Sequence, residues 1–366
     1  MKAPIYLDYQ ATTPVAPEAA AAMRPWLEEK FANPHSPHAL GREAAAAIEV
    51  ARAQVLDALQ GARSGKLHFT SGATEAVNWA LRGSGATRIV TLATEHACVL
   101  DTVEWLAGQG HEVEILPVGA DGLVDLDLAA ERITPGTGLV AAMLVNNEIG
   151  VIQPVAEIAR IAHAAGALFL CDAVQGFGRV PLPLESCDLV ALSAHKIHGP
   201  KGVGALWVRD GVRLEPLLHG GGQEGGLRSG TLSPMLCAGF GAAARLLGSD
   251  SDHVERLWAA ARELTRDWQL NGSQTQRYHG NLNLRRDGID AARLISEVRD
   301  VAFSAGSACA SGSGRPSHVL AVLGLTDREA RASIRLGLGR YTTEGELRTA
   351  LGLIEEAAAR QLRFAA

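Results

Sequence analysis

Between residues 66 and 210 the chain alternates short apolar runs with segments of helical periodicity. The runs are rich in Val, Ile and Leu and are apolar at consecutive positions, as in strands that are buried on both faces. They are KLHFT, RIVTLA, EVEIL, LVAAMLV, ALFLCDA, DLVALSA and GALWV, and helical segments such as TEAVNWALRG and PVAEIARIAHAAG separate several of them. The pattern predicts an α/β fold with a mostly parallel sheet wrapped by helices.

After about residue 250 the pattern changes. Two helical stretches, around 233–248 and 252–268, lead into the apolar run NLNLRR and a loop rich in Gly and Ser at 304–314. The strand-like run SIRLGLG and a helix from Thr343 follow. This order of segments predicts a second, smaller α+β unit.

Composition narrows the class of protein. A chain of 366 residues with 47% hydrophobic and 20% charged residues is typical of a globular protein with room for two cores. Its net charge of -6 is modest, and no block of Lys and Arg suggests nucleic acid. No run approaches the roughly 20 apolar residues of a membrane span, and the start MKAPIYLDYQ has no apolar signal-peptide core. We therefore expect a cytoplasmic protein that binds neither membrane nor nucleic acid.

The cysteines are Cys98, Cys171, Cys187, Cys237 and Cys309. They are odd in number, far apart and free of any C-x-x-C pair. This spacing argues against a disulfide framework and against a zinc site, so we expect no metal.

Ligands of parallel sheets bind at the carboxyl ends of the strands, and several candidate residues lie at predicted strand ends. The segment FTSGATEA leads from strand to helix through a turn of small residues, which is either a phosphate cradle or a plain helix start. Asp172 ends the run ALFLCDA. It is either a helix N-cap or a carboxylate that pairs with a buried cation or a protonated ring nitrogen.

Lys196 follows the run DLVALSA and lies between His195 and His198. A surface lysine needs no such setting, whereas a lysine that must be partly neutral does, because burial and nearby positive charge both disfavour its charged form. A phosphate cradle, an acid and a Schiff-base lysine are together the protein partners of pyridoxal phosphate.

Further candidates have both a structural and a functional interpretation. His96 is either structural or stacks on a flat ring and exchanges protons. Asn146, Asn147 and Glu148 either satisfy loop backbone or face a ligand. Cys309, in AFSAGSACASGSG, is either an inert cysteine in a linker or a nucleophile that must travel.

Nearly the whole chain resembles one family, the pyridoxal-phosphate cysteine desulfurases of fold type I (the class V aminotransferase group). The matching segments occur in the order of the family. They are YLDYQATTP, NPHSPHALG, FTSGATEA, EHACVLD, NNEIGVIQP, DAVQ, SAHKIHGPKGVGAL, GGGQEGGLRSGT, GSACASGSGRPSHVL and SIRLGLGRYTTEGEL.

The resemblance implies a large PLP-binding domain at 15–250 and a small domain that combines 1–14 with 251–366 and carries a mobile catalytic-cysteine loop. It implies removal of sulfur from L-cysteine to give L-alanine and an enzyme persulfide. An acceptor protein would take that sulfur for iron–sulfur cluster or other sulfur-cofactor assembly. The enzyme would be a homodimer whose active sites are completed across the interface.

The resemblance also implies residue roles. Lys196 would hold the cofactor covalently and take the Cα proton, and Cys309 would attack the substrate sulfur. Asp172 would pair with the pyridine nitrogen, and His96 would stack on the ring. The other expected contacts are Gln175 and Asn147 near the phenolic oxygen; Ala73, Thr74, Ser193 and His195 at the phosphate, with Thr231 from the other subunit; and Arg335, Asn147 and Asn33 at the substrate.

Other functions stay open at this point. A class V aminotransferase needs no thiol, so the loop around Cys309 argues against it. A catalytically idle partner of another desulfurase would not need the reactive residues. The presence of Lys196, His96, Asp172, Arg335 and Cys309 therefore argues against this class. A selenocysteine lyase stays open as the alternative, because the pocket would accept either chalcogen. The C-terminal sequence is shorter than the tail by which housekeeping members dock a scaffold, which leaves the sulfur acceptor open.

Overall fold

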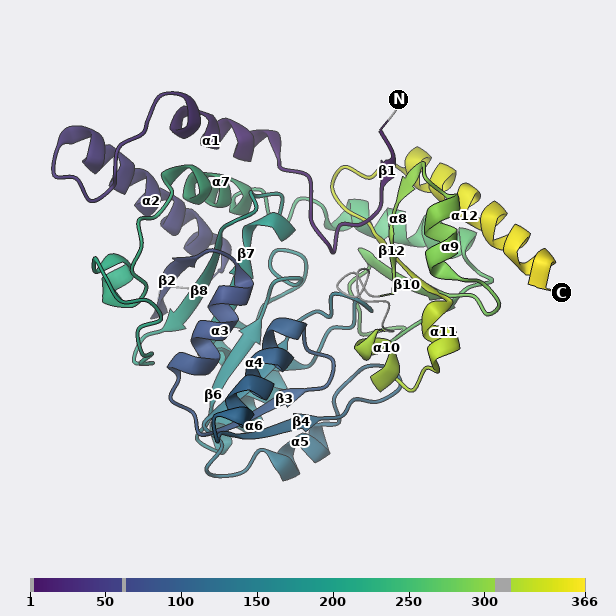
Figure 1. Cartoon of the computed structure of the whole chain (residues 1–366), viewed down its shortest axis with the longest axis horizontal. Helices are drawn as coiled ribbons and strands as arrows, with labels where there is room; N and C mark the ends of the chain where they lie inside the picture. The colour runs from purple at the N-terminus through teal and green to yellow at the C-terminus, as the bar shows by residue number, and fades with distance from the viewer. Residues whose placement is uncertain (1–2, 61–63, 307–316, 366) are drawn as a thin grey trace.

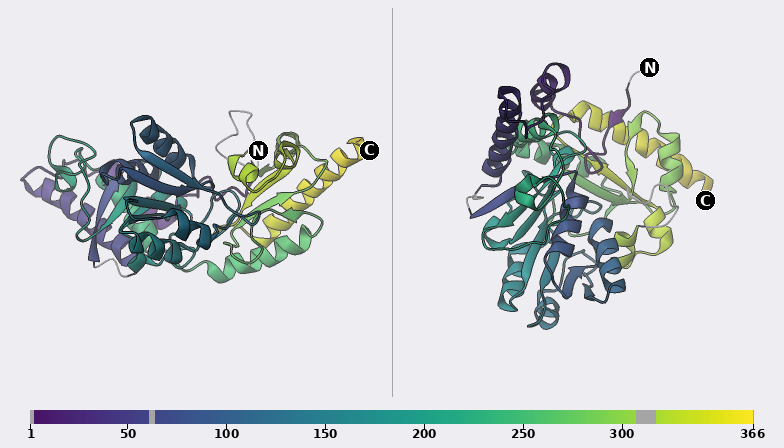
Figure 2. Two further views of the ribbon diagram at one scale, coloured as in Figure 1. Left: turned by 90° about the horizontal axis from the view of Figure 1, so that it is seen from below. Right: turned by 60° about the vertical axis from the view of Figure 1, so that its left-hand side comes forward.

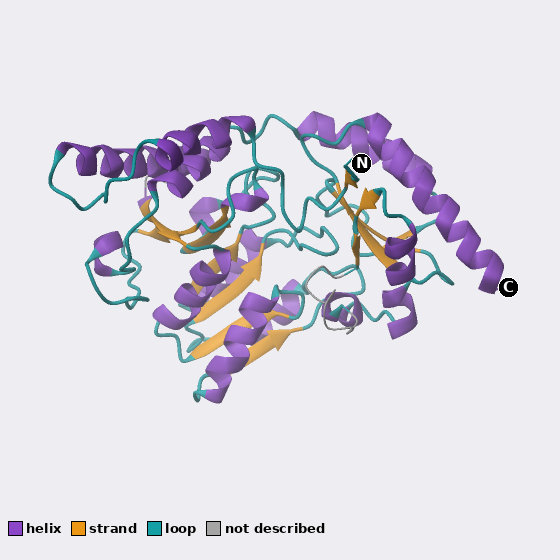
Figure 3. Cartoon of the chain, turned by 45° about the horizontal axis from the view of Figure 1, so that its top comes forward, coloured by secondary structure: helices purple, strands orange, loops and turns teal. Residues whose placement is uncertain are grey.

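A computed structural model of the chain describes residues 3–60, 64–306 and 317–365, and its elements carry the labels of Figure 1. In this part of the chain the strands form a seven-stranded sheet, a four-stranded sheet and a two-stranded ladder. Helices lie on both sides of the larger sheet (Figure 3).

The seven-stranded sheet confirms the mostly parallel sheet that the apolar runs predict. Its strands in spatial order are β2 (Gly65–Thr70), β8 (Gly204–Arg209), β7 (Leu189–Ser193), β6 (Leu168–Asp172), β5 (Leu139–Met143), β3 (Arg88–Leu92) and β4 (Glu112–Leu116). Only β8 runs antiparallel to its neighbours among these described strands. The carboxyl ends of β2, β3, β5, β6 and β7 therefore meet at one edge of the sheet.

Apolar residues at consecutive strand positions fill two separate cores. Val90 and Val140 lie in a core with α1, α2, α5, α6 and α7, whereas Ile89 and Leu139 lie in a core with α3 and α4. Side chains alternate across a sheet, so a strand covered on both faces needs apolar residues at every position. The helices are α1 (Pro17–Glu28), α2 (Ala39–Ala58), α3 (Ala73–Gly83), α4 (Ala97–Gly108), α5 (Leu126–Arg132), α6 (Val155–Ala164) and α7 (Pro234–Ala244).

The second group of elements lies beside the large sheet (Figure 2). Its antiparallel sheet has the order β12 (Ser304–Ala305), β13 (Ser333–Gly337), β10 (Asn281–Arg285) and β9 (Gln269–Leu270). Its helices are α8 (Ser251–Leu264), α9 (Ala291–Glu297) and α12 (Glu344–Ala365). This arrangement matches the predicted α+β unit, including the strand at SIRLGLG and the last helix. The exception is the first predicted helical stretch, because α7 packs in the core of the large sheet.

The N-terminal segment packs with this second group rather than with the sequence that follows it. β1 (Ile5–Tyr6) pairs in parallel with β11 (Val301–Ala302), and Leu7 lies in the same buried cluster as Leu336 and Ile354. This packing supports, as a proposal, a small domain built from residues 1–14 and 251–366.

Two short helices connect the groups. α10 (His318–Val322) and α11 (Asp327–Arg331) contribute to a small buried cluster with Ile149 and Val151, which follow β5. In the described residues no helix is long and apolar enough to cross a membrane. Nor do those residues contain a group of three or more His, Cys, Asp or Glu that could hold a metal ion.

Candidate active site

A cavity of about 500 Å³ lies at the edge where the carboxyl ends of the parallel strands meet, a size within the usual range of small-molecule sites. The residues expected from the sequence that line it are Ala73, Thr74, His96, Asn147, Asp172, Gln175, Ser193, His195, Lys196 and Arg335. Other lining residues are Gln10, Ala11, Ser71, Gly72, Cys98, Met143, Val145, Val174, Lys201 and Gly202. Residues far apart in the sequence thus share one site.

The turn between β2 and α3 forms the anion-binding end of the cavity. Gly72 is the N-cap of α3 and no side chain caps the helix there, so its first N–H groups and the positive end of its dipole face the cavity wall. Gly204 of β8 packs under this turn. A Cβ at Gly204 would lie 2.5 Å from the carbonyl oxygen of Leu192 and 2.7 Å from Gly72. The strand therefore needs glycine at this position for the turn to approach.

Lys196 lies in the short 3-10 turn η3 (Ala194–Lys196) directly after β7. Its Nζ donates hydrogen bonds to the carbonyl oxygens of Gln10, at 2.6 Å, and Ala11, at 2.8 Å. The N-terminal segment therefore contributes directly to the site. The sequence pattern gave no reason to expect this contact, because it joins residues 186 positions apart.

Asp172 ends β6 and is 7% exposed. Its Oδ1 accepts the N–H of Val174 at 3.0 Å, and turns rather than a helix follow it, so the N-cap interpretation is wrong. Burial raises the pKa of Asp172, and that bond together with His96 and Lys196 acts in the opposite direction. A buried carboxylate that is stabilised by positive charge is suited to hold a protonated ring nitrogen.

His96 has a structural role and also lines the cavity. It is the N-cap of α4, where its Nδ1 accepts the N–H of Cys98 at 3.1 Å. It also lines the cavity, and burial lowers its pKa, with Asp172 raising it and Lys196 lowering it. The lowered pKa favours the neutral ring, and the hydrogen bond that Nδ1 accepts favours the tautomer with the proton on Nε2.

His195 is also held neutral. Burial, with the positive charges of Lys196, Lys201 and Arg179, lowers the pKa of His195 to about 4. Its Nδ1 lies 3.1 Å from the Thr12 hydroxyl. Lys201 lines the same cavity and was missed by the sequence analysis, although it lies in the quoted segment SAHKIHGPKG.

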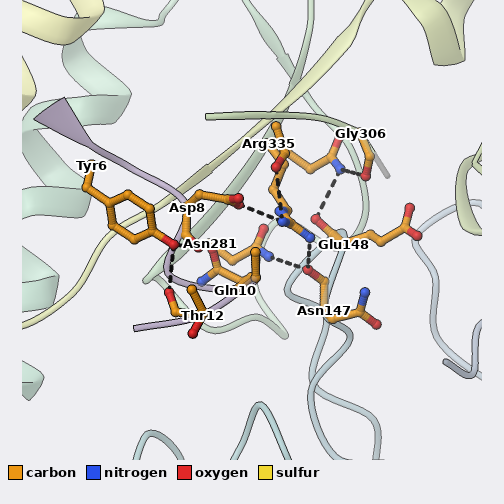
Figure 4. A network of polar contacts seen from close by, with 12 residues as sticks. Tyr6, Asp8, Gln10, Thr12, Asn147, Glu148, Asn281, Gly306 and Arg335 are labelled. Atoms are coloured by element: carbon orange, nitrogen blue, oxygen red, sulfur yellow. Dashed lines mark hydrogen bonds and ion pairs between the residues drawn. The ribbon is translucent and has the colours of Figure 1, made fainter. Parts of the chain in front are cut away.

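In the polar loop after β5, the two neighbouring asparagines have different contacts. The side chain of Asn146 satisfies the loop, because its Oδ1 accepts the N–H groups of Glu148 and Ile149. Asn147 lines the cavity instead, and its carbonyl oxygen accepts a hydrogen bond from Arg335 Nη1 at 3.0 Å (Figure 4).

Arg335 of β13 brings the second group of elements to the cavity. It is fully buried, and its Nη2 lies 2.7 Å from Asp8 Oδ1. Its Nε has no hydrogen-bond partner in the structure. A buried guanidinium at this position can bind a substrate carboxylate.

Three expected residues are not among the described residues that line this cavity, for two different reasons. Asn33 and Thr231 are exposed and do not line it. Cys309 lies outside the described residues. Their roles stay predictions.

Residues 5–349 match the aminotransferase class-V family, and the chain belongs to that family. The cysteine desulfurase IscS of Rickettsia bellii (strain OSU 85-389) is 45% identical over 370 residues, which cover 96% of this chain and 90% of that protein. A solved NifS-like protein superposes with a TM-score of 0.89 at 33% identity, covering 98% of this chain and all of that one. A structure described as SspA in complex with cysteine has a TM-score of 0.82 at 34% identity, covering 92% and 99%.

Proposed function

We propose that this chain is a pyridoxal-phosphate-dependent cysteine desulfurase. It removes sulfur from L-cysteine, releases L-alanine and keeps the sulfur as a persulfide on Cys309. The observation that carries the proposal is the cavity that brings a helix N-terminus, Asp172, Lys196 and Arg335 together. The similarity to proteins named cysteine desulfurase over almost the whole chain supports the same reaction.

The cavity fits pyridoxal 5'-phosphate through the chemistry of its residues. Uncapped N–H groups at the start of α3, with Lys201 nearby, suit the phosphate. The buried carboxylate of Asp172 suits the ring nitrogen, and Lys196 suits the covalent attachment. When bound, the cofactor supplies an electron sink for the electron pair left on the Cα of an amino acid.

The residues of this chain then have distinct tasks. Lys196, displaced by the substrate amine, would accept the Cα proton on Nζ, which donates hydrogen bonds to the backbone carbonyl oxygens of Gln10 and Ala11. Neutral His96 would carry protons through its Nε2. Arg335 would hold the substrate carboxylate.

Sulfur transfer uses the Cys309 thiolate. It forms an S–S bond with the substrate sulfur as the C–S bond breaks, and the electron pair of that bond passes to the substrate side. The substrate carbon takes up a proton and leaves as L-alanine. A thiolate suits this step because it is a far better nucleophile than a hydroxyl at neutral pH.

Several parts of the proposal extend beyond the reaction. We propose a homodimer in which Thr231 completes the site of the partner subunit, with Asn33 near the substrate. We also propose a protein acceptor for the sulfur, used for iron–sulfur clusters or another sulfur cofactor, and a cytoplasmic location.

The function is tested by incubating the purified protein with L-cysteine and dithiothreitol and measuring alanine and sulfide. In the Cys309→Ser variant, exchange of the Cα hydrogen with deuterated solvent should continue while alanine release stops. Mass spectrometry should find added sulfur on the wild-type peptide that contains Cys309. A Cys98→Ala variant is the control, because Cys98 is a thiol that lines the cavity, and it should still carry sulfur on Cys309. Alanine release by Cys309→Ser at the wild-type rate would contradict the proposal and favour a lyase without a cysteine nucleophile.

A further inference from the structure

Arg335, the proposed carboxylate-binding residue, already has a carboxylate partner from its own chain. Its Nη2 contacts Asp8 Oδ1 at 2.7 Å and, more weakly, the hydroxyl of Ser304 at 3.4 Å. Its Nη1 donates to the carbonyl oxygen of Asn147 at 3.0 Å. Figure 4 shows Asp8 and Asn147 on different sides of the guanidinium. The positive charge is therefore neutralised before any substrate carboxylate arrives.

The geometry of a guanidinium makes this contact competitive. It can hold a carboxylate with two parallel hydrogen bonds, either through Nε and Nη2 or through Nη1 and Nη2. Both arrangements use Nη2, which is bonded to Asp8 and Ser304. A substrate carboxylate can therefore make two hydrogen bonds to Arg335 only if it displaces Asp8 or shares Nη2 with it.

The backbone of Asp8 is held firmly in place. Its carbonyl oxygen accepts a hydrogen bond from the Tyr6 hydroxyl at 3.1 Å, and the same hydroxyl lies 2.9 Å from the carbonyl oxygen of Thr12. Asp8 also forms a bridge with Gly337 of β13, two residues after Arg335. A Cβ at Gly337 would lie 2.5 Å from the backbone nitrogen of Tyr9, so glycine is needed for this approach.

Asp8 is thus tied to the same strand as Arg335. Burial raises the pKa of Tyr6 to about 12, which keeps its hydroxyl as a donor over the working pH range. These contacts tie the backbone of Asp8 to β13, so its carboxylate would leave Arg335 by rotation of the side chain.

We propose that Asp8 is a positioning residue that occupies Arg335 until substrate binds and so sets the affinity of the site for a carboxylate. The inference rests on the proposed function in one respect, the assignment of Arg335 to the substrate carboxylate. A second carboxylate beside Asp8 is repelled by it, and that repulsion keeps amino acid binding weaker than Arg335 alone would make it.

The test uses Asp8→Asn, which keeps an oxygen acceptor for Nη2 and removes the negative charge. The probe is propionate, which carries the carboxylate of the substrate without its amine or thiol, and the control ligand is uncharged propionamide. We expect the Kd of propionate for the holoenzyme, measured by ligand-observed NMR titration, to fall about fivefold, a conservative value for removing one like charge at contact distance. The Kd of propionamide should not change, and the KM for L-cysteine should fall in parallel with that of propionate.

Control variants separate this effect from a structural one. Asp250 forms another part-buried ion pair, with Arg340, and neither residue lines the cavity. Asp250→Asn removes the carboxylate of this pair. It should leave both Kd values unchanged. Asp8→Ser, which also keeps an oxygen without the charge, replaces Asp8→Asn if that variant does not fold, as judged by circular dichroism.

The inference is overturned if removing the charge leaves propionate binding unchanged or weaker, or if neither the wild type nor the variant binds propionate. Its failure differs from failure of the proposed function. A wild type that releases alanine from L-cysteine while Asp8→Asn changes nothing would overturn the inference alone. Tighter propionate binding in the variant of a protein without desulfurase activity would overturn the proposed function alone.

Discussion

At the residue scale, burial and nearby charges shift the pKa values of titratable groups in the cavity. Lys196 donates to two carbonyl oxygens, and beside it burial and positive neighbours lower the pKa of His195 to about 4. Asp172 is the buried carboxylate among them. These residues line one cavity, as the proposed cofactor would require.

A substitution at Asp172 can test the role of its negative charge without changing the shape of the site. Asp172→Asn keeps the oxygen that accepts the N–H of Val174, so the turn after β6 should stay intact. It cannot carry the negative charge that favours a protonated ring nitrogen. We expect folded protein with cofactor bound and turnover lower by at least about tenfold, which is roughly 1.4 kcal/mol in the barrier. Turnover near the wild-type value would show that Asp172 acts only through the turn.

His198 gives a pH dependence that is independent of catalysis. Burial lowers the pKa of His198 to about 4, with Arg340 and Arg179 acting in the same direction and its bond to Pro14 and the charge of Asp250 opposing them. Between about pH 6.5 and 4 the unfolded chain therefore binds a proton that the folded chain does not. This contribution favours the folded state above pH 6.5 and is lost as the pH falls toward 4.

We therefore expect the free energy of unfolding to fall less between pH 7 and pH 5 in His198→Asn than in the wild type. Asparagine is the suitable replacement because residue 198 has a φ of 68°, a left-handed conformation that Asn tolerates. Urea unfolding at both pH values measures the difference. An equal loss in both proteins would show that His198 titrates normally in the folded state.

Single residues also show the limit of sequence reasoning. Asn146 and Asn147 are neighbours of the same type, and only the turn after β5 decides that one satisfies the loop and the other lines the cavity. The contact between Arg335 and Asp8 joins residues 327 positions apart, and no local pattern encodes it.

At the element scale, the strands were predictable because their apolar runs reflect burial on both faces. The helices α1 and α2 were not predicted. Their sequences contain the Ala runs AAAA and present few large apolar residues, so periodicity carries little signal there. The helices α1 and α2 are buried by packing with α7, which is a tertiary contact that local periodicity does not encode. Likewise, the pairing of β1 with β11 is visible only in the structure.

The attachment of the N-terminal segment to the second group can be measured. Leu7 is fully buried among residues of α8, β10, β13 and α12. Leu7→Ala should lower the free energy of unfolding by about 2–5 kcal/mol through lost burial and a cavity. Leu27, 74% exposed on α1, is the matched control, and Leu27→Ala should change stability by less than about 0.5 kcal/mol. Denaturant unfolding would contradict the packing if the two variants behaved alike.

At the scale of the whole molecule, Thr231 does not line the cavity of its own chain. The segment before it is fixed on the surface by Glu224, whose carboxylate pairs with Arg52 at 2.9 Å, and by the pair of Arg228 with Glu75 at 2.7 Å. Such a segment holds Thr231 exposed in a defined place, as an isologous dimer contact requires. This position is compatible with the proposed role of Thr231 in the active site of a second copy.

A heterodimer tests this directly. One subunit carries Lys196→Ala and its partner carries Thr231→Ala, each with a different affinity tag so that the mixed dimer can be purified. If Thr231 acts across the interface, one site of this dimer keeps both Lys196 and Thr231, and the other lacks both. Its alanine release should then be about half that of the wild-type dimer, while the Lys196→Ala homodimer is inactive and the Thr231→Ala homodimer is impaired in binding the cofactor. If Thr231 instead serves its own chain, the only site with Lys196 lacks Thr231, and the heterodimer can reach no more than half the activity of the impaired Thr231→Ala homodimer.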